Sequence, residues 1–191
     1  MVFYRKLYAH LLEWKNRKGR KPLIIRGARQ VGKSTLVSEF AKVLKYHIYL
    51  NLEKREERKI FDALNDKRDI INSMFLRAGI PRTDQPTLIF LDEIQESPEA
   101  VGQLRYFHEE YPQLYVIAAG SLLEFTLKRI ASFPVGRVEQ VVLHPFDFDE
   151  FLLALNRQDV YDELDHIPVN SYAHDTILKL FHDYAIIGGM P

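Results

Sequence analysis

The residues of this chain best suited to chemistry form one run, Gly27-Ala28-Arg29-Gln30-Val31-Gly32-Lys33-Ser34. Their spacing matches the phosphate-binding loop G-x-x-x-x-G-K-[ST] at every fixed position. Glycines let the backbone curl so that successive N–H groups point at phosphate oxygens. Lys33 supplies a full charge that can reach the β- and γ-phosphates, and the Ser34 hydroxyl is a candidate Mg²⁺ ligand. The run therefore predicts a site for the phosphates of a nucleotide.

The residues on either side of this run fit the same interpretation. Residues 23–25 form a short apolar segment typical of a buried strand, and residues 35–41, beginning at Thr35, have the pattern of a helix. The amino end of that helix would add its partial positive charge to the phosphate site. Ala28, Arg29 and Gln30 fill variable positions of the loop and receive no catalytic role, and a solvated or partner-facing Arg29 is favoured over a phosphate ligand.

An acidic pair, Asp92 and Glu93, ends the apolar segment 87–91. Four consecutive apolar residues are typical of a fully buried parallel strand, and ligands bind at the carboxyl edge of such sheets. Asp92 would hold Mg²⁺ and Glu93 would polarise an attacking water molecule. The alternative is that the two acids only begin a helix, where acidic residues are favoured. Beside the phosphate loop, the catalytic interpretation is preferred.

Ser121 follows another apolar segment, residues 114–119, that predicts a strand between the loop strand and the acidic strand. A polar residue at that point could sense the γ-phosphate. Ser121 could equally cap a helix over residues 122–125, because Glu124 three residues later completes a capping box. Both roles are compatible.

Strands alternate with helices along the chain, which indicates a parallel sheet with helices on both faces. Further strands are predicted over residues 46–52 and 138–143, and helices over 3–14, 53–78, 97–111, 147–155 and 173–187. The fold class is α/β: a three-layer P-loop NTPase with a five-stranded, mostly parallel sheet in the order 5-1-4-3-2, followed by C-terminal helices. We expect one domain over 1–191, with an N-terminal helix and basic linker (1–22) and a helical C-terminal part (144–191).

The composition is that of an ordinary globular protein. The chain has 191 residues, of which 47% are hydrophobic and 27% charged, and its formal net charge is zero, so no global field draws it to nucleic acid or anionic lipid. The absence of cysteine excludes disulfides and thiolate metal sites. No apolar run long enough for a membrane span and no secretion signal are evident, so a cytoplasmic protein without membrane contact is expected.

The chain resembles the AAA-type predicted ATPases of bacteria and archaea that carry a C-terminal domain of unknown function. The resemblance rests on blocks that follow the order of the family: Pro22 to Ser34, Leu91-Asp92-Glu93-Ile94-Gln95, Ala119-Gly120-Ser121, Phe133 to Val138, Leu143 to Phe151 and Gly188-Gly189-Met190-Pro191. It implies an ATP-binding, Mg²⁺-dependent core in which Lys33 and Ser34 contact phosphate and metal and Asp92 and Glu93 form the acidic pair.

The same resemblance draws attention to Arg137, which follows a glycine before the last predicted strand. It could reach the γ-phosphate of its own or a neighbouring subunit in a homo-oligomer, or only pair with a surface acid. Members of the family continue past the Gly-Gly-Met-Pro block into a second domain. We expect that domain to select an as yet undefined protein or nucleic-acid partner.

Three functions fit these residues. The first is Mg²⁺-dependent ATP hydrolysis, and the second is a nucleotide-gated switch with little turnover of its own. The third is a DNA-associated module, for which only the basic linker Lys15, Arg17, Lys18, Arg20 and Lys21 argues. Because the linker lacks interleaved aromatic residues, a solvated loop is favoured there. ATP is preferred over GTP only through the family resemblance.

Overall fold

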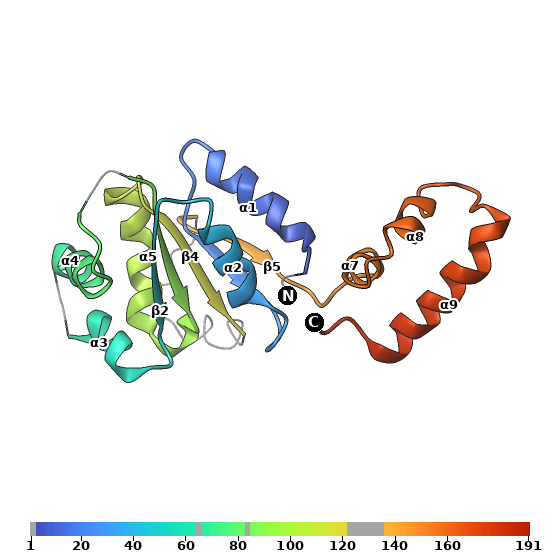
Figure 1. Cartoon of the computed structure of the whole chain (residues 1–191). Coiled ribbons are helices and arrows are strands. Elements are labelled where there is room, and N and C mark those ends of the chain that lie inside the picture. Colours follow the sequence, from blue (N-terminus) through green and yellow to red (C-terminus); the bar gives the residue numbers. More distant parts are fainter. Residues whose placement is uncertain (1–2, 64–65, 83–84, 122–135) are drawn as a thin grey trace.

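The computed structural model describes residues 3–63, 66–82, 85–121 and 136–191 of the chain. Within these residues one sheet has the strands β1 (Leu23–Arg26), β2 (Tyr46–Asn51), β3 (Thr87–Asp92), β4 (Tyr115–Gly120) and β5 (Glu139–Val142). All paired strands run parallel, in the order β2-β3-β4-β1-β5. The predicted α/β class and strand order are confirmed (Figure 1).

Helices cover the sheet on both faces, and the central strands β3 and β4 are buried along almost their whole length. Alternate residues of a strand point to opposite faces. Leu88 and Phe90 pack with α1 (Lys6–Asn16) and α2 (Lys33–Ala41), whereas Ile89 and Leu91 pack with α3 (Arg55–Asp62), α4 (Lys67–Arg77) and α5 (Pro98–Glu110). All of β3 is buried. The acidic pair at its end is therefore carried by one of the most firmly packed strands.

A local signal in the sequence marks the start of α5. Ser97 caps α5 by accepting a hydrogen bond from the Ala100 amide, and Pro98 occupies the first turn, as the sequence predicts. A short 3₁₀ turn, η1 (Ile94–Glu96), links β3 to this helix. The single helix predicted over 53–78 is wrong, because the chain forms α3 and α4 separately. The helix predicted over 122–125 lies outside the described residues.

The amino-terminal segment differs from the prediction in one respect that matters for the site. The periodicity of apolar residues predicts a helix that includes Phe3, but α1 begins at Lys6. Leu11 and Trp14 are buried against the sheet as expected. Phe3 instead lies ahead of the helix and packs edge-on against Phe146, with ring centroids 5.6 Å apart. The segment before α1 is thus part of a wall beside the phosphate loop and not part of the helix.

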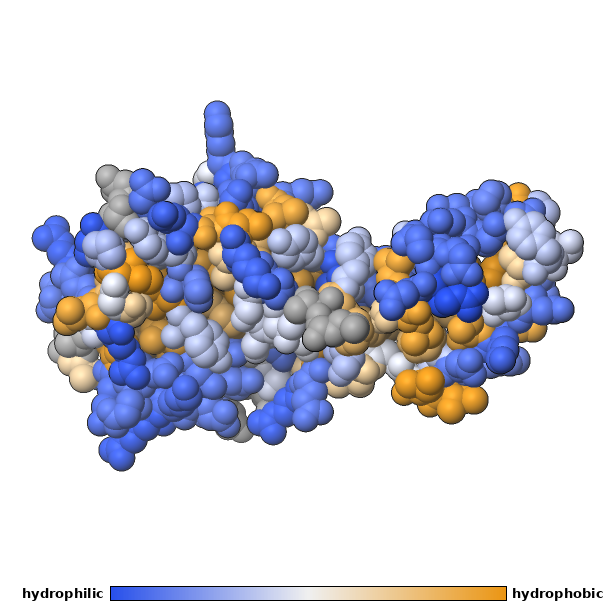
Figure 2. Space-filling view, in the orientation of Figure 1, coloured by the Kyte–Doolittle hydropathy of each residue, from blue (hydrophilic) through white to orange (hydrophobic). Residues whose placement is uncertain are grey.

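Three helices follow the sheet and project from one side of it (Figure 1). They are α7 (Phe148–Ala154), α8 (Gln158–Glu163) and α9 (Ser171–Ile187), of which α8 was not predicted. Phe148 and Phe151 of α7 pack against Phe181 and Tyr184 of α9. Figure 2 shows hydrophobic side chains along one edge of these helices, and those of Phe181, Ile186 and Ile187 are exposed.

The chain returns at its end to the start of these helices. The Phe146 amide donates to the Gly189 carbonyl at 2.6 Å, and the Tyr184 hydroxyl donates to the Phe146 carbonyl at 2.7 Å. Both ends of the described chain lie close to the phosphate loop, because Phe3 and Pro191 line the same hollow as Gln30 and Gly32 (Figure 1). In the described part of the chain, helices of the length and apolarity needed to span a bilayer are not found.

Candidate functional site

The phosphate loop joins β1 to α2 at the carboxyl edge of the sheet. Gly27 has no room for a side chain, because a Cβ there would lie 2.3 Å from the Leu143 carbonyl oxygen. Gly32 has φ 91°, a conformation that favours glycine, and α2 begins at the next residue without a side-chain cap. The first amides of α2 are therefore oriented as in an anion site.

Side chains of the loop divide between the core and solvent. Val31 is fully buried and anchors the loop, whereas Ala28, Arg29 and Gln30 are exposed at its tip. Ser34 and Thr35 stand exposed in the first turn of α2. Arg29, Gln30, Gly32, Lys33, Ser34, Thr35, Glu53 and Glu93 line a hollow of about 410 Å³. Six of the nine predicted loop residues thus line the same cavity as Glu93, whereas Gly27, Ala28 and Val31 do not.

Lys33 is held inside the loop. Its ammonium group donates to the carbonyls of Gly27 at 3.1 Å and Ala28 at 2.8 Å, and only 6% of the residue is exposed. Burial lowers the pKa of the Lys33 ammonium, while the nearby carboxylates of Glu93 and Asp92 oppose the shift. A phosphate in the hollow would be a stronger partner for the Lys33 ammonium than the two neutral carbonyls, because it carries negative charge.

Asp92 and Ser34 are brought together by the pairing of β3, β4 and β1. The Ser34 hydroxyl donates to Asp92 Oδ2 at 2.7 Å, and Asp92 is 4% exposed. The hydroxyl of Tyr49, in β2, donates to the same oxygen at 3.2 Å. Burial, together with the charge of Asp92, raises the pKa of Tyr49 to about 12. Two oxygen donors suited to Mg²⁺ therefore lie in direct contact.

Glu93 sits at the strand end in a left-handed conformation, with φ 52°. That geometry turns the chain sharply after β3, and Glu93 lines the same hollow as Lys33. One carboxylate oxygen accepts a hydrogen bond from the Gln95 amide. Gln95 therefore fixes the carboxylate that was predicted to polarise water. A non-glycine residue with positive φ is uncommon and is often found at functional sites.

Ser121 lies at the carboxyl edge as predicted. β4 pairs with both β1 and β3, and Gly120 is in register with Arg26, so Ser121 follows between the loop and the acidic strand. Its hydroxyl oxygen is buried and has no hydrogen-bond partner within the described ranges. A buried hydroxyl without a partner is costly unless something binds it.

Arg137 is not brought to the site. It precedes β5, which runs parallel to β1 with Glu139 in register with Leu23. The loop follows the opposite end of β1, so roughly 13 Å of strand separates the two positions. Arg137 instead pairs with Glu109 of α5, from Nε to Oε1 at 2.8 Å, and its side chain is 55% exposed. It cannot reach the loop of its own chain in this structure.

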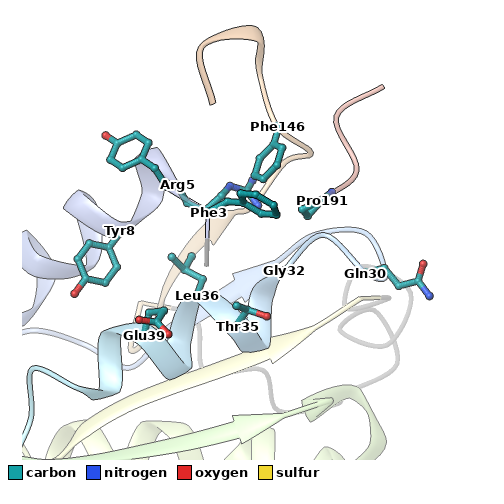
Figure 3. Close-up of a pocket in the computed structure, with 11 residues that line it drawn as sticks. Phe3, Arg5, Tyr8, Gln30, Gly32, Thr35, Leu36, Glu39, Phe146 and Pro191 are labelled. Carbon is teal, nitrogen blue, oxygen red and sulfur yellow. The ribbon is translucent and has the colours of Figure 1, made fainter. Parts of the chain in front are cut away.

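A second, larger hollow adjoins the phosphate loop (Figure 3). It measures about 610 Å³ and shares Gln30, Gly32 and Thr35 with the first. Its other walls come from the segment before α1, from α1 and α2, from the segment between β5 and α7, and from the last described residue: Phe3, Tyr4, Arg5, Tyr8, Leu36, Glu39, Phe146 and Pro191. Aromatic walls beside the predicted phosphate loop suit a flat, partly apolar group joined to phosphates.

Comparison with known proteins identifies the family. A family model described as an AAA domain matches residues 19–152. The chain belongs to the AAA domain family. An uncharacterized protein of Haemophilus influenzae is 26% identical to this AAA domain protein in an alignment of 179 residues, which covers 88% of this chain and 39% of that protein. The resemblance to AAA-type ATPases is thereby confirmed.

Solved structures share the fold. A Walker-type ATPase of Pyrococcus abyssi superposes with a TM-score of 0.58 at 20% identity, covering 100% of this chain and 65% of that one. A Drosophila ORC structure bound to DNA gives 0.53 at 17% identity, with 82% and 47% covered. An Aeropyrum pernix Orc1 protein in complex with DNA gives 0.51 at 16%, with 83% and 50% covered. This AAA domain chain thus spans less than two thirds of the length of each.

The sequence did not single out several residues that the fold brings to the AAA site. Tyr49 and Gln95 contact the acidic pair, and Arg5 and Phe146 line the larger hollow. Gln95 belongs to the block Leu91 to Gln95, so the sequence shows that it lies two residues after Glu93. The sequence does not show that the Gln95 amide contacts the Glu93 carboxylate. Arg5 and Phe146 lie 141 positions apart, so only the tertiary fold brings them together.

Proposed function

We propose that this AAA domain binds ATP with Mg²⁺ and hydrolyses it. The phosphates would bind the loop amides and Lys33, and the base would enter the aromatic hollow beside them. Glu93 would orient and polarise the water that attacks the γ-phosphate, while Ser121 senses that phosphate. Lys33 and the loop amides would stabilise the charge that develops in the transition state.

The contact between Ser34 and Asp92, 2.7 Å from hydroxyl to carboxylate, carries the proposal. It joins the two halves of the predicted site across β1, β4 and β3. The described residues contain no group of three or more His, Cys, Asp or Glu side chains suited to a metal. Mg²⁺ fits this donor set, because it is usually held by one or two protein oxygens together with substrate phosphates and water. When bound there, it would neutralise phosphate charge.

A nucleotide-gated switch with little turnover uses the same residues. The Gln95 hydrogen bond to Glu93 is compatible with both functions, because it can hold the carboxylate ready or keep it from water. Turnover by the purified chain distinguishes them. If the chain binds Mg²⁺-ATP and Glu93→Gln leaves the rate of phosphate release unchanged, the switch is the better description.

The test is calorimetric titration with ATP, ADP and GTP, with and without Mg²⁺, combined with measurement of phosphate release. We expect binding of ATP and ADP that strengthens with Mg²⁺. Lys33→Ala should weaken ATP binding by about a hundredfold or more, because a charge-assisted contact is lost from a desolvated site. The matched control is Lys42→Ala, an exposed lysine just after α2. No heat with any nucleotide would refute the proposal.

Association with DNA receives little support from the basic linker. Arg17 is paired with Glu139 at 2.6 Å. Arg20 lies 3.6 Å from the Tyr115 ring centroid and donates to carbonyls of residues 112–114. Both arginines hold the linker to the sheet. The ORC and Orc1 structures that share the fold are bound to DNA, but at 16–17% identity they support a common fold only.

A further inference from the structure

Arg5 is a buried cation that the proposed reaction does not use. Only 7% of the residue is exposed, although arginine is among the residues least often buried. Its guanidinium lies 4.6 Å from the Phe146 ring centroid and contributes to the wall of the larger hollow (Figure 3). A buried guanidinium must have its donors satisfied, so the partners of Arg5 indicate its role.

One of these partners belongs to the phosphate loop. Arg5 Nη1 donates to the Val31 carbonyl at 2.8 Å. The carbonyl of Val31 and the N–H of Gly32 belong to the same peptide unit, which is planar and trans, so they point in opposite directions. Because Arg5 holds the Val31 carbonyl toward itself, the Gly32 amide points to the opposite side of the loop. Hydrogen bonding to the guanidinium also polarises that amide.

The other partners belong to the chain that leads into the C-terminal helices. Arg5 Nε pairs with Glu150 Oε2 at 3.2 Å, and Nη2 donates to the His144 carbonyl. Glu150, in α7, is itself 5% exposed, and its second oxygen accepts the Lys6 amide at 2.7 Å. One guanidinium therefore connects the amino-terminal segment, the phosphate loop and α7.

We propose that Arg5 is a positioning residue for phosphate binding. It fixes the orientation of the Val31–Gly32 peptide so that the Gly32 amide faces a bound phosphate. Through its ion pair with Glu150 it also connects this peptide to α7. The ligand it favours is the phosphate chain of a nucleotide, not the base, although Arg5 lines the proposed base hollow. This inference rests on the proposed nucleotide binding and adds a residue outside the loop to it.

The experiment compares two probes, Mg²⁺-ADP and adenosine, by calorimetry on the whole chain. Arg5→Lys keeps the charge but cannot reach Val31, His144 and Glu150 together, because lysine lacks the planar fork of arginine. We expect its affinity for ADP to fall roughly ten- to hundredfold, the effect of losing one charge-assisted contact in the site. Adenosine affinity should change by less than about threefold, because the preset amide contacts no part of it.

A second comparison covers the case in which Arg5→Lys fails to fold. Arg5→Met/Glu150→Gln removes the buried charges together, a change that folded proteins tolerate well. Measured against Glu150→Gln alone, it should show the same selective loss of ADP affinity. The matched control is Lys6→Ala, which removes the ion pair of Lys6 with Asp147 but touches no loop carbonyl. Its ADP affinity should stay within about threefold of the parent value.

The outcomes separate this inference from the proposed function. If the parent chain binds no Mg²⁺-ADP, the proposed function fails and this inference fails with it. If the parent binds and the Arg5 variants bind ADP equally well, only the inference is refuted. Equal losses for ADP and adenosine would also refute it, because they would show that Arg5 supports the hollow as a whole.

Discussion

Gln95 is the residue that most directly controls the proposed catalytic carboxylate. Its amide donates to Glu93, whose backbone already adopts an uncommon left-handed conformation. Gln95→Ala should lower the rate of ATP turnover about tenfold, because Glu93 loses the contact that fixes its orientation toward water. ATP affinity should change little, since Gln95 does not line the phosphate hollow. Steady-state turnover and titration of ATP on the same preparation measure both.

A neighbour on the same turn supplies the control for this prediction. Glu96 in η1 contacts Arg58 at 3.8 Å, near the surface. Its backbone amide donates to the Glu93 carbonyl at 3.0 Å, a bond that a change of side chain retains, and its side chain has no described contact with the Glu93 carboxylate. Glu96→Gln should leave turnover at the parent value. Equal rates for the parent and Gln95→Ala would contradict the prediction. A faster Gln95→Ala enzyme would show instead that the hydrogen bond restrains Glu93, as a switch requires.

Single residues were predictable from the sequence where a motif fixes their spacing along the chain. Lys33 and Ser34 are tied to their loop by a continuous pattern, and Asp92 ends an apolar strand, so their meeting follows from sheet topology. Arg5 belongs to no local pattern, and the strand predicted over residues 46–52 does not reveal that Tyr49 contacts Asp92. These contacts depend on how the segment before α1 and the strand β2 pack, which no short-range signal specifies. Arg137 lies at the amino end of the strands, away from the loop of its own chain, and pairs with Glu109, which is the surface-acid alternative that the sequence left open.

The attachment of α7 to α1 depends on charges at two helix ends. Asp147 caps α7 by accepting the Glu150 amide, and it also accepts a 2.7 Å hydrogen bond from Lys6. Partial burial raises the pKa of Asp147, but the Glu150 amide and the Lys6 ammonium together lower it below its ordinary value. A lowered pKa in the folded state means that the carboxylate stabilises the fold above its unfolded pKa, about 3.9.

Asp147→Asn isolates this charge, because asparagine is also a good helix cap. We expect the variant to be less stable than the parent at pH 7 by up to about 1 kcal/mol, the usual scale of an exposed ion pair. The gap should close as pH falls below about 3.9 and the parent carboxylate takes up its proton. Urea unfolding at several pH values measures it. In a Lys6→Ala background most of the gap should be absent, and a pH-independent gap would contradict the prediction.

At the scale of helices and strands, the sequence predicted those elements whose apolar residues pack against the two faces of the sheet. The apolar runs of β1, β3 and β4 indicated buried parallel strands, and the cap of α5 was visible in Ser97 and Pro98. The division between α3 and α4 and the short helix α8 were missed. Both involve short, polar segments whose helical state depends on tertiary contacts more than on periodicity.

The junction between the sheet and the C-terminal helices depends on one glycine. A Cβ on Gly189 would lie 2.2 Å from the Phe146 carbonyl oxygen. Gly189→Ala should therefore force the chain end away from Phe146 and lower the free energy of unfolding by about 1–3 kcal/mol, the usual cost of overpacking. Because Pro191 lines the larger hollow, Mg²⁺-ADP affinity should fall as well. Chemical denaturation and titration measure the two effects.

Gly102 in α5 is the matched control. A Cβ there meets no atom within 4 Å, and alanine favours a helix interior over glycine by roughly 0.5–1 kcal/mol. Gly102→Ala should leave the chain equally or more stable, with unchanged ADP affinity. If Gly189→Ala behaved in the same way, the close approach at Phe146 would not hold the junction together.

The hydrogen bond from Phe146 to Gly189 has a mechanical consequence. The chain enters and leaves the three C-terminal helices at the same place, where its two backbone segments are joined by this 2.6 Å hydrogen bond. The ion pairs of Arg5 with Glu150 and of Lys6 with Asp147 lie at the same junction, beside the phosphate loop. α9 has 17 residues, about 25 Å of helix, and Ser171 is at the end remote from Gly189. A rotation of about 10° at the junction would move that end of α9 by about 4 Å.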